Sequence, residues 1–595
     1  MKPVDQIAPE GARLAPRARA LWFGPVDRPL FGWLHVPEDG RARGGVLLTP
    51  TLGIEEVNAR YAYRRIADRL AESGFAVLRF DYEGTGDSAG DGDEPGRVGA
   101  WLGSIRTALE LVRSLELGRT SVVGLRMGAT LAAEIVGSGP AVIDDLVLWD
   151  PCASGRSFLR EQSALWKFAR GAESASDGSI ETPGLVYSKD TVTDLSECVI
   201  ASGRGQMAER VLVLMRAGRA GDRRMNERLA MPHAVRRDIE GQEELVHVQP
   251  DAAKVPDETV TIIVEWLADA VASAPTRSID ADVVGRSCAV RVTSDGATIE
   301  ERSVSLGPLG LFGIMTTPLA CGEDGGGADA AMVGQLPTVF FSNAGVIDHV
   351  GPARLWVQLS RLWAEAGFRS LRFDLSGLGD SPVRAGHPGL EVLSPDGLED
   401  MAEVLHAVLA GDPTNAVLVG LCSGALYALE EGMARAVRGV CAINPILTLN
   451  LPEPAVDQAS DPGTDVGRRE VTGGMKGWVR KMPAYDLINR VVQRLPSSAW
   501  WIINRVAVET PPAQRLGQVV DAQVNVLVIA GTDEGRWLRG GESRTFRRLE
   551  DTGRFRMEVI PGLEHTLFEW RTREIAAAIL TEHVIGKFGS SSRRD

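Results

Sequence analysis

Short apolar runs alternate with longer segments of helical periodicity along most of this chain. The run GVLLT, from residue 45, precedes a segment whose apolar residues recur every three or four positions, and the second short run AVLRFD follows it. Strands that alternate with helices form βαβ units, which build a largely parallel sheet. The pattern therefore predicts an α/β fold.

The same pattern occurs twice. Residues 45–90 and 338–383 align element by element, and each ends in a glycine-rich turn, GTGDS or GLGDS. Each copy is followed by an apolar strand, a G-x-x-x-G turn and an alanine-rich helix, at 121–135 and 416–432. A chain of 595 residues is also too long for one core, because single domains rarely exceed roughly 250 to 300 residues. We predict two tandem domains, 1–275 and 276–595.

Each half also carries an insertion between its alanine-rich helix and its last strands. In the second half the insertion includes residues 477–506, whose apolar and aromatic residues recur at roughly helical spacing. Such an inserted helical cap shapes a substrate pocket, and Trp500 and Trp501 are candidate pocket residues. Ordinary packing of a helix on the core is the alternative for both tryptophans.

Composition excludes several classes of function. The formal net charge of -15 argues against a nucleic-acid partner, which needs a basic face. No run of ~18 uncharged apolar residues predicts a membrane span, and the first residues lack the pattern of a signal peptide, so we expect a cytoplasmic protein. The six cysteines show no CxxC spacing or nearby histidine cluster, so we expect no disulfide framework and no metal site.

The second half contains a motif that is typical of a nucleophile at a strand-to-helix turn. It reads Gly420-Leu421-Cys422-Ser423-Gly424, with Cys422 at the apex. Glycine two residues on either side leaves room for the strained backbone of such a turn. We therefore predict Cys422 as the nucleophile. Ser423 as the nucleophile would require a turn without its flanking glycines.

Two further landmarks complete a catalytic triad. The apolar strand in VNVLVIAGTDEG ends at Asp533, which we predict as the triad acid, with Glu534 as a neighbour that could be mistaken for it. His565 follows the last strand in RMEVIPGLEHTLFEW and is the predicted base. The order nucleophile, acid, histidine is that of α/β-hydrolases. Taken alone, Cys422 would more simply be a buried small residue, and Asp533 or His565 would more simply be a turn residue.

The backbone N–H of Ser423 is one predicted oxyanion-hole donor. The other should come from the loop after the preceding strand, at Ala344 or Gly345, where Asn343 is also a candidate pocket residue. His349 lies in the same loop, and the sequence leaves open whether it is a pocket residue or a turn residue.

The first half keeps this turn but not its chemistry. Its motif is Gly124-Leu125-Arg126-Met127-Gly128, and a guanidinium, which stays protonated, cannot attack a carbonyl. Asp222 is the candidate for the acid, and Asp251 stands where the histidine is expected. We predict a non-catalytic domain. Arg126 would form a structural ion pair, or alternatively bind an anionic group such as a carboxylate.

The two halves resemble the exosortase A system-associated hydrolases, in the serine-aminopeptidase-like branch of the α/β-hydrolases. The first half is similar to the type 2 member through GFAVLRFDYEGTGDSAGD and VGLRMGATLAAE, and the second to the type 1 member through FRSLRFDLSGLGDS and VGLCSGA. The resemblance implies two tandem α/β-hydrolase domains, each with a helical cap, and a hydrolase or acyltransferase. A fused pair is also compatible with a role in specialised-metabolite biosynthesis.

A cysteine nucleophile favours one kind of reaction. Its acyl-enzyme is a thioester, which stays reactive toward amines and thiols, so acyl transfer competes with hydrolysis. We therefore expect an acyltransferase, thioesterase or esterase that acts on a small acyl ester or thioester, presented free, by CoA or by a carrier protein. We expect no cofactor. The alternative is a scaffold protein in which neither half turns over.

Overall fold

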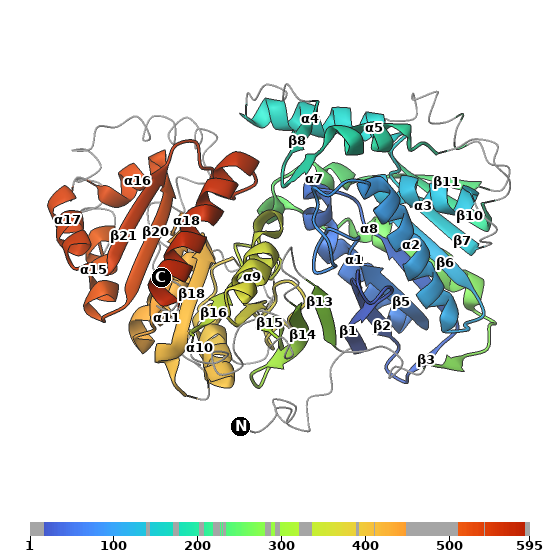
Figure 1. Ribbon diagram of the computed structural model, residues 1–595. Coiled ribbons are helices and arrows are strands. Elements are labelled where there is room, and N and C mark those ends of the chain that lie inside the picture. Colours follow the sequence, from blue (N-terminus) through green and yellow to red (C-terminus); the bar gives the residue numbers. More distant parts are fainter. Residues whose placement is uncertain are drawn as a thin grey trace, which may run out of the picture. The chain divides into compact units, whose positions relative to one another are not determined.

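The computed structural model describes most of the chain and divides it into two compact units (Figure 1). Unit 1 comprises residues 1–392 together with 566–595, and unit 2 comprises residues 393–565. The described residues are 17–138, 143–170, 178–200, 207–217, 227, 229, 234–279, 287–291, 298–319, 336–387, 389, 392–409, 411–447, 510–540 and 542–589. The predicted cap helices at 477–506, with Trp500 and Trp501, lie outside these residues.

The first repeat forms one mixed sheet in unit 1. Its strand order is β1-β2-β5-β4-β6-β7-β10-β11; the first two pairings are antiparallel and the other five are parallel. The strands are β1 (Arg17–Phe23), β2 (Leu30–Val36), β4 (Gly44–Thr49), β5 (Phe75–Phe80), β6 (Thr120–Leu125), β7 (Ile143–Trp149), β10 (Ala208–Arg216) and β11 (Ala234–Ile239).

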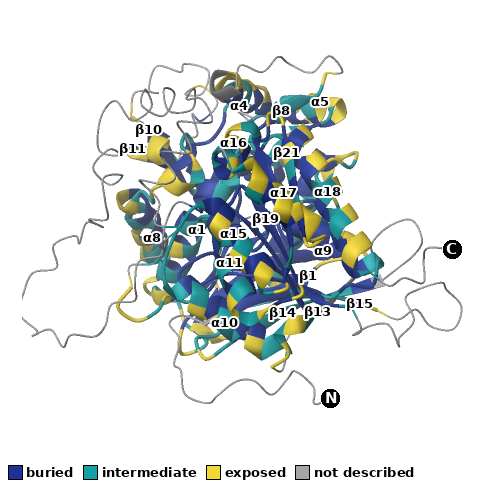
Figure 2. Cartoon of the chain, turned by 90° about the vertical axis from the view of Figure 1, so that its left-hand side faces the viewer, coloured by how far each residue is buried: buried dark blue, intermediate teal, exposed yellow. Residues whose placement is uncertain are grey.

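Helices cover both faces of this sheet, because its central strands are apolar on both sides. Helices α1 (Ile54–Glu72), α7 (Gln242–Val246) and α8 (Asp257–Val271) contribute to the core of one face. Helices α2 (Arg97–Ser114) and α3 (Met127–Ser138) contribute to the core of the other. Figure 2 shows that the strands are largely buried and that the helices carry exposed residues on their outward sides.

The first half also has an insertion after β7, as the sequence predicts. It contains α4 (Gly155–Arg170), the short hairpin β8 (Ile180–Thr182) and β9 (Leu185–Tyr187), and α5 (Lys189–Glu197). Figure 1 shows α4, α5 and β8 gathered together. The chain then returns to the sheet through β10.

The opening strands of the second repeat also belong to unit 1. Their order is β13-β14-β15-β17-β16, antiparallel except for the last pairing. The strands are β13 (Ser287–Arg291), β14 (Thr298–Leu306), β15 (Leu311–Pro318), β16 (Thr338–Phe341) and β17 (Ser370–Phe373); unit 1 also holds α9 (Leu355–Glu365) and α18 (Trp570–Phe588).

Unit 2 carries four parallel strands in the order β18-β19-β20-β21. These are β18 (Ala416–Leu421), β19 (Gly439–Ile443), β20 (Asn525–Gly531) and β21 (Phe555–Ile560). The helices of the unit are α10 (Asp396–Leu409), α11 (Ser423–Arg435), α15 (Pro512–Asp521), α16 (Thr532–Arg539) and α17 (Ser543–Asp551). The predicted α/β class, with a sheet in each repeat, is confirmed.

The predicted boundary at 275/276 is not where the compact units divide. The short strand β12 (Arg277–Ser278) still pairs with β3 (Arg41–Ala42) of the first repeat. The first repeat and the opening strands of the second share unit 1. The boundary at 275/276 therefore remains a prediction of where the first repeat ends and the second begins.

Inside unit 1 the two repeats hold each other by exchanging arginine–aspartate pairs. Arg79, which precedes the turn of the first repeat, pairs with Asp380 in the turn of the second. Arg372, at the equivalent position of the second repeat, pairs with Asp87 in the turn of the first. This reciprocity is the property of an isologous two-fold interface. The GTGDS and GLGDS turns therefore act here as pairing elements between the repeats.

Equivalent side chains also cap each turn from the opposite repeat. The offset of 293 residues that relates Arg79 to Arg372 also relates Tyr61 to Arg354. The Tyr61 hydroxyl accepts a hydrogen bond from the backbone N–H of Gly379 at 2.9 Å. Arg354 donates to the backbone oxygens of Gly86 at 2.8 Å and Ser88 at 2.6 Å. Carbonyls and amides that would otherwise be buried without partners are thus satisfied.

His349 lies at the centre of this contact. It is buried, with Nε2 2.7 Å from Asp87 and Nδ1 2.8 Å from Asp374. Burial works against protonation, but the two carboxylates outweigh it and raise the pKa of His349 well above its ordinary value. The imidazolium and Arg372 in turn hold the pKa of Asp87 well below its usual range, although burial opposes this. His349 and Arg372 thus form a buried ionic network with Asp87 and Asp374, in which two positive charges face two carboxylates.

An apolar cluster adjoins this network. Trp33 of the first repeat and Phe312 of the second have ring centroids 4.6 Å apart, in an edge-on arrangement. Such aromatic pairs contribute about 0.5 to 1.5 kcal/mol in addition to the free energy gained by burying their apolar area.

Among the described helices, none combines the length and the apolar character needed to cross a membrane.

We predict that Arg372→Met lowers the free energy of unfolding by about 3 to 5 kcal/mol, because it leaves Asp87 and Glu301 buried without one of their cations. The matched control is Arg65→Met, because the Arg65 side chain is 53% exposed and pairs with Asp257, which is 60% exposed; loss of this pair should cost about 1 kcal/mol or less. Urea denaturation of both variants measures the difference. Equal urea midpoints for Arg372→Met and Arg65→Met would contradict a stabilising role for the buried network.

Candidate functional site

Cys422 occupies a strained turn between β18 and α11. Its backbone has φ 59° and ψ -115°, a conformation that non-glycine residues rarely adopt. Its N–H donates to the carbonyl of Ile443 at 3.0 Å, which ties the turn to β19. A Cβ atom at Gly420 would overlap the backbone of Gly424, so the predicted need for glycine at this motif is met physically. Strain of this kind is typical of functional turns.

His565 lies beside Cys422, in the loop that follows β21. A hydrogen bond links its imidazole to the Cys422 thiol group, and Nδ1 lies 3.7 Å from Oε1 of Glu534. Burial alone would lower the pKa of His565. The hydrogen bond to Cys422 and the carboxylate of Glu534 outweigh burial and raise this pKa to about 10. The side chains therefore form a connected row, Cys422–His565–Glu534.

The carboxylate beside His565 is that of Glu534, whereas the sequence pattern predicts Asp533 as the triad acid. Both residues lie in the first turn of α16, which begins directly after β20. Adjacent side chains on a helix point about 100° apart, so one of the two faces His565 and the other does not. Asp533 is 57% exposed and lies 3.8 Å from Arg536. His565 holds the pKa of Glu534 below its usual value, against the effect of burial.

Asn444, which the sequence pattern does not single out, holds the loop that carries His565. Its amide nitrogen donates to the backbone oxygens of Glu564 at 3.0 Å and His565 at 3.3 Å. Its amide oxygen accepts from the N–H of Gly531 at 3.0 Å, at the end of β20. One side chain thus connects the histidine loop to the strand that leads to Glu534. The repeated Asp-Pro and Asn-Pro pairs at 150–151 and 444–445 are the sequence signal for this position.

The predicted oxyanion residues fall in different units. Ser423 is buried and is the first residue of α11 in unit 2. In unit 1, Ala344 forms an isolated bridge with Ile347, and Gly345 has φ 60°. The second donor of an oxyanion hole stays a prediction.

Asn343 and His349 are buried side chains with hydrogen-bond partners in unit 1. The Asn343 amide donates to Asp374 at 2.9 Å and to the Ile347 carbonyl at 3.0 Å, and its oxygen accepts from the Leu375 N–H at 2.6 Å. His349 lies between Asp87 and Asp374. His349 is part of the buried contact between the repeats, and Asn343 supports that contact from within the second repeat by donating to Asp374. The sequence could not show this, because their partners lie on other elements.

Arg126 occupies the same kind of turn in the first half, with φ 52°. Its guanidinium is fully buried and lies 2.8 Å from Glu161, 3.1 Å from Glu55 and 3.4 Å from Asp150. Three carboxylates from the protein itself therefore occupy the positions that a bound anion would take. This geometry favours the structural ion pair over anion binding.

The other two residues predicted for this first site are Asp251 and Asp222. Asp251 is exposed, in the short 3-10 helix Pro250–Ala252. Asp222 lies outside the described residues. His247 contacts Glu161 at 2.7 Å. In the described part of the chain, no group of three or more His, Cys, Asp or Glu residues is arranged to hold a metal ion.

Comparison with known families agrees with the two sheets. The model of the "Alpha/beta hydrolase family" matches residues 342–578, and that of "Serine aminopeptidase, S33" matches residues 46–175. Each match contains one strand-to-helix turn, with Cys422 in the first range and Arg126 in the second.

Solved structures are similar at low identity. An esterase from Pyrococcus furiosus is 14% identical, with a TM-score of 0.29, over 43% of this chain and 92% of its own. Est1E from Butyrivibrio proteoclasticus is 13% identical, with a TM-score of 0.31, over 43% of this chain and 99% of its own. A predicted hydrolase from Thermoplasma acidophilum is 14% identical, with a TM-score of 0.28, over 43% and 99%.

The two family matches, the two mostly parallel sheets and the two glycine-flanked turns lead to one assignment. This chain consists of two α/β-hydrolase domains in tandem.

Proposed function

We propose that the second domain is an enzyme that forms a covalent acyl thioester on Cys422 and passes the acyl group to water or to another acceptor. The observation that carries the proposal is the row Cys422–His565–Glu534, with Cys422 at a strained turn. We assign Glu534 as the acid in place of Asp533, because Glu534 is the carboxylate beside His565.

The mechanism follows from this geometry. His565 takes the thiol proton of Cys422, and Glu534 stabilises the resulting imidazolium. The thiolate attacks the acyl carbonyl, and a new C–S bond forms as the carbonyl becomes an oxyanion. When the oxyanion collapses, the bond to the leaving alcohol or thiol breaks, and the imidazolium gives that leaving group its proton. His565 then deprotonates water or an acceptor, which attacks the thioester and releases Cys422.

A cysteine in this role favours activated esters and thioesters over amides. A thiolate is a better leaving group than an unprotonated amine. The tetrahedral intermediate formed from an amide would therefore expel the Cys422 thiolate and return to the substrate more readily than it would release the amine. We therefore propose an acyltransferase, thioesterase or esterase. Its substrate is a small acyl ester or thioester, presented free, by CoA or by a carrier protein. The resemblance to exosortase A system-associated hydrolases and a place in specialised-metabolite biosynthesis stay predictions.

The first domain is proposed to be non-catalytic. Arg126 replaces the nucleophile and is engaged by Glu55, Asp150 and Glu161. A scaffold function for the whole chain is the competing hypothesis. It predicts a Cys422 thiol no more reactive than an ordinary one, which iodoacetamide alkylation near neutral pH would distinguish.

The central prediction concerns a covalent adduct. Incubation with a panel of acyl thioesters and activated esters should add one acyl mass to the wild-type chain and none to Cys422→Ala, as measured by intact mass spectrometry. Cys441→Ala is the matched control, because that thiol is buried and burial raises its pKa to about 12. An adduct that persists in Cys422→Ala, or no adduct with any donor together with slow alkylation of Cys422, would reject the mechanism.

The second prediction separates the two adjacent acids. Glu534→Gln should lower kcat/KM by about 100-fold or more, because a charged partner of the base is lost, while Asp533→Asn should change it little. Glu534 helps to raise the pKa of His565, so its loss lowers that pKa. The alkaline limb of the pH profile, where the imidazolium loses its proton, should therefore move to lower pH. A larger effect from Asp533→Asn would restore the assignment made from the sequence.

The third prediction tests Asn444 as a positioning residue. Asn444→Ala removes the three hydrogen bonds that connect the His565 loop to Gly531, so kcat should fall about tenfold or more while KM changes little. Asn525→Ala is the control, because its amide also donates to a backbone carbonyl, that of Arg438, but at an exposed site. An Asn444→Ala variant that folds, as judged by circular dichroism, and keeps wild-type kcat would show that the brace is dispensable.

A further inference from the structure

Unit 1 contains a cavity of about 760 Å³, with residues of both repeats in its wall. The wall comes from α1 and residues 184–186 of the β8–β9 hairpin in the first repeat, from α9 in the second, and from the beginning of α18. Its volume is within the range of roughly 300 to 1,000 Å³ that is typical of small-molecule sites. The wall contains neither the proposed catalytic residues, which belong to unit 2, nor the buried Arg126.

Hydrogen bonds connect the separate parts of this wall. The backbone N–H of Trp570, the first residue of α18, donates to the carboxylate of Glu181 in the hairpin at 3.0 Å. The N–H of Gly184 donates to the carbonyl of Phe568 at 3.4 Å. Arg354, just before α9, donates to backbone carbonyls in the turn of the first repeat. The cavity is therefore preformed, and a ligand would not have to order its wall.

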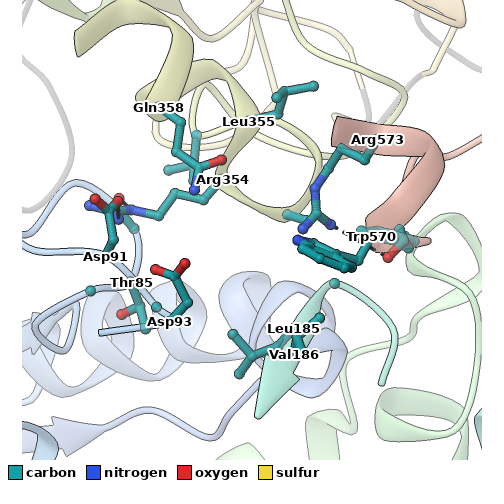
Figure 3. Close-up of a pocket in the computed structure, with 18 of the residues that line it drawn as sticks. Thr85, Asp91, Asp93, Leu185, Val186, Arg354, Leu355, Gln358, Trp570 and Arg573 are labelled. Atoms are coloured by element: carbon teal, nitrogen blue, oxygen red, sulfur yellow. Dashed lines mark hydrogen bonds and ion pairs between the residues drawn. The ribbon is translucent and has the colours of Figure 1, made fainter. Parts of the chain in front are cut away.

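Much of the wall is apolar. Figure 3 shows Leu185 and Val186 on the side of the hairpin and Leu355 on the side of α9. Phe568 and Trp570 add two aromatic rings at the beginning of α18. Each methylene group that a ligand buries against such side chains raises its affinity by about fourfold.

The arginines of the wall are engaged within the protein. Three of them form ion pairs with carboxylates of unit 1, and these are Arg60, Arg354 and Arg361. The fourth, Arg573, lies beside the Trp570 indole in Figure 3 and is buried. It donates to the carbonyl of Phe568 at 3.5 Å and has a further interaction within the chain. An anionic ligand would have to compete with these contacts, which is costly at a buried ion pair.

The carboxylates of the wall do not provide a site for a cation either. Four of them already interact within the protein, and these are Glu56, Asp91, Asp348 and Glu365. The other two, Asp93 and Glu574, are exposed to solvent. A cationic ligand would therefore lose its water to apolar side chains and arginines, and burial of a charge without a partner is unfavourable.

The wall also offers an uncharged polar group, the side-chain amide of Gln358. Gln358 follows Leu355 by three residues on α9, so the two side chains lie on the same face of the helix. In Figure 3 the amide extends from α9 toward the cavity. Among the residues that the structure describes, none forms a hydrogen bond with this amide. An amide both donates and accepts, so it suits a hydroxyl or a carbonyl group.

We propose that this cavity binds an uncharged amphipathic molecule that has an apolar body and one hydroxyl or carbonyl group. The apolar body lies against Leu185, Val186 and Leu355, and the polar group bonds to the amide of Gln358. The apolar area of the wall favours the body, and the engaged charges disfavour an ionic head group. The site is separate from the chemistry proposed at Cys422, so either proposal can fail without the other.

The test uses three ligands of equal chain length, octanol, octanoate and octyltrimethylammonium, added to the full-length Cys422→Ala chain. Isothermal titration calorimetry should show that octanol binds about tenfold or more tightly than either ion, because the ions lose hydration without gaining a partner. Across straight-chain butanol, hexanol and octanol, affinity should rise by about fourfold for each added methylene group.

Variants of the same Cys422→Ala chain locate the site. Ala578→Trp, at an exposed wall position of α18, places an indole in the cavity and should weaken octanol binding by about tenfold or more. Gln358→Leu removes the amide and should weaken octanol binding by about three- to tenfold. The matched control is Ile575→Trp, on the same helix, at a position that is 49% exposed and outside the wall. It should leave octanol binding unchanged.

Several results would overturn the proposal. They are the absence of octanol binding, binding of either ion as tight as that of octanol, and affinity that does not rise with chain length. Equal weakening by Ile575→Trp and Ala578→Trp, or unchanged octanol affinity in Gln358→Leu, would also overturn it. Circular dichroism of each variant checks that a loss of binding is not a loss of folding.

Discussion

The exchange of arginine–aspartate pairs between the two repeats is the interaction on which unit 1 depends. Arg79 and Asp380 form one pair, and Arg372 and Asp87 form the other. Buried ions are costly to desolvate and are tolerated when every charge has well-placed partners. Here His349, Glu301 and Arg361 complete the balance. The contact therefore fixes one arrangement of the two repeats, because a shifted arrangement would leave several ions buried without partners.

In unit 2, hydrogen bonds and close packing likewise hold a few side chains in one arrangement. The turn at Cys422 is held in an unfavourable conformation by the tie to Ile443 and by glycine packing. Asn444, the residue after Ile443, holds the loop of His565. Ile443 at the end of β19 and the next residue, Asn444, thus position both Cys422 and the loop of His565. Preorganisation of this kind reduces the rearrangement that a reaction requires.

Features that depend on local pattern could be predicted from the sequence, and features that depend on long-range contacts could not. The repeat, the alternating strands and helices, and the apex position of Cys422 follow from periodicity and glycine spacing, and the structure has the corresponding elements. Asp533 and Glu534 differ by one helical position, so the choice between them required the orientation of α16. The burial of His349 depends on Asp87, which lies 262 residues away in the chain.

The reciprocal pairing also bears on how such a chain can change over time. Residues 79 and 380, and residues 372 and 87, are each other's counterions, so a charge-altering substitution at one site is tolerated only with a compensating change at the other. A first half with arginine at its strand-to-helix turn therefore still supports the second half, since Arg79 and Asp87 pair with residues of the second repeat and not with Arg126. The second half would then constrain the RFD and GDS residues of the first half, whether or not the first half has a function of its own.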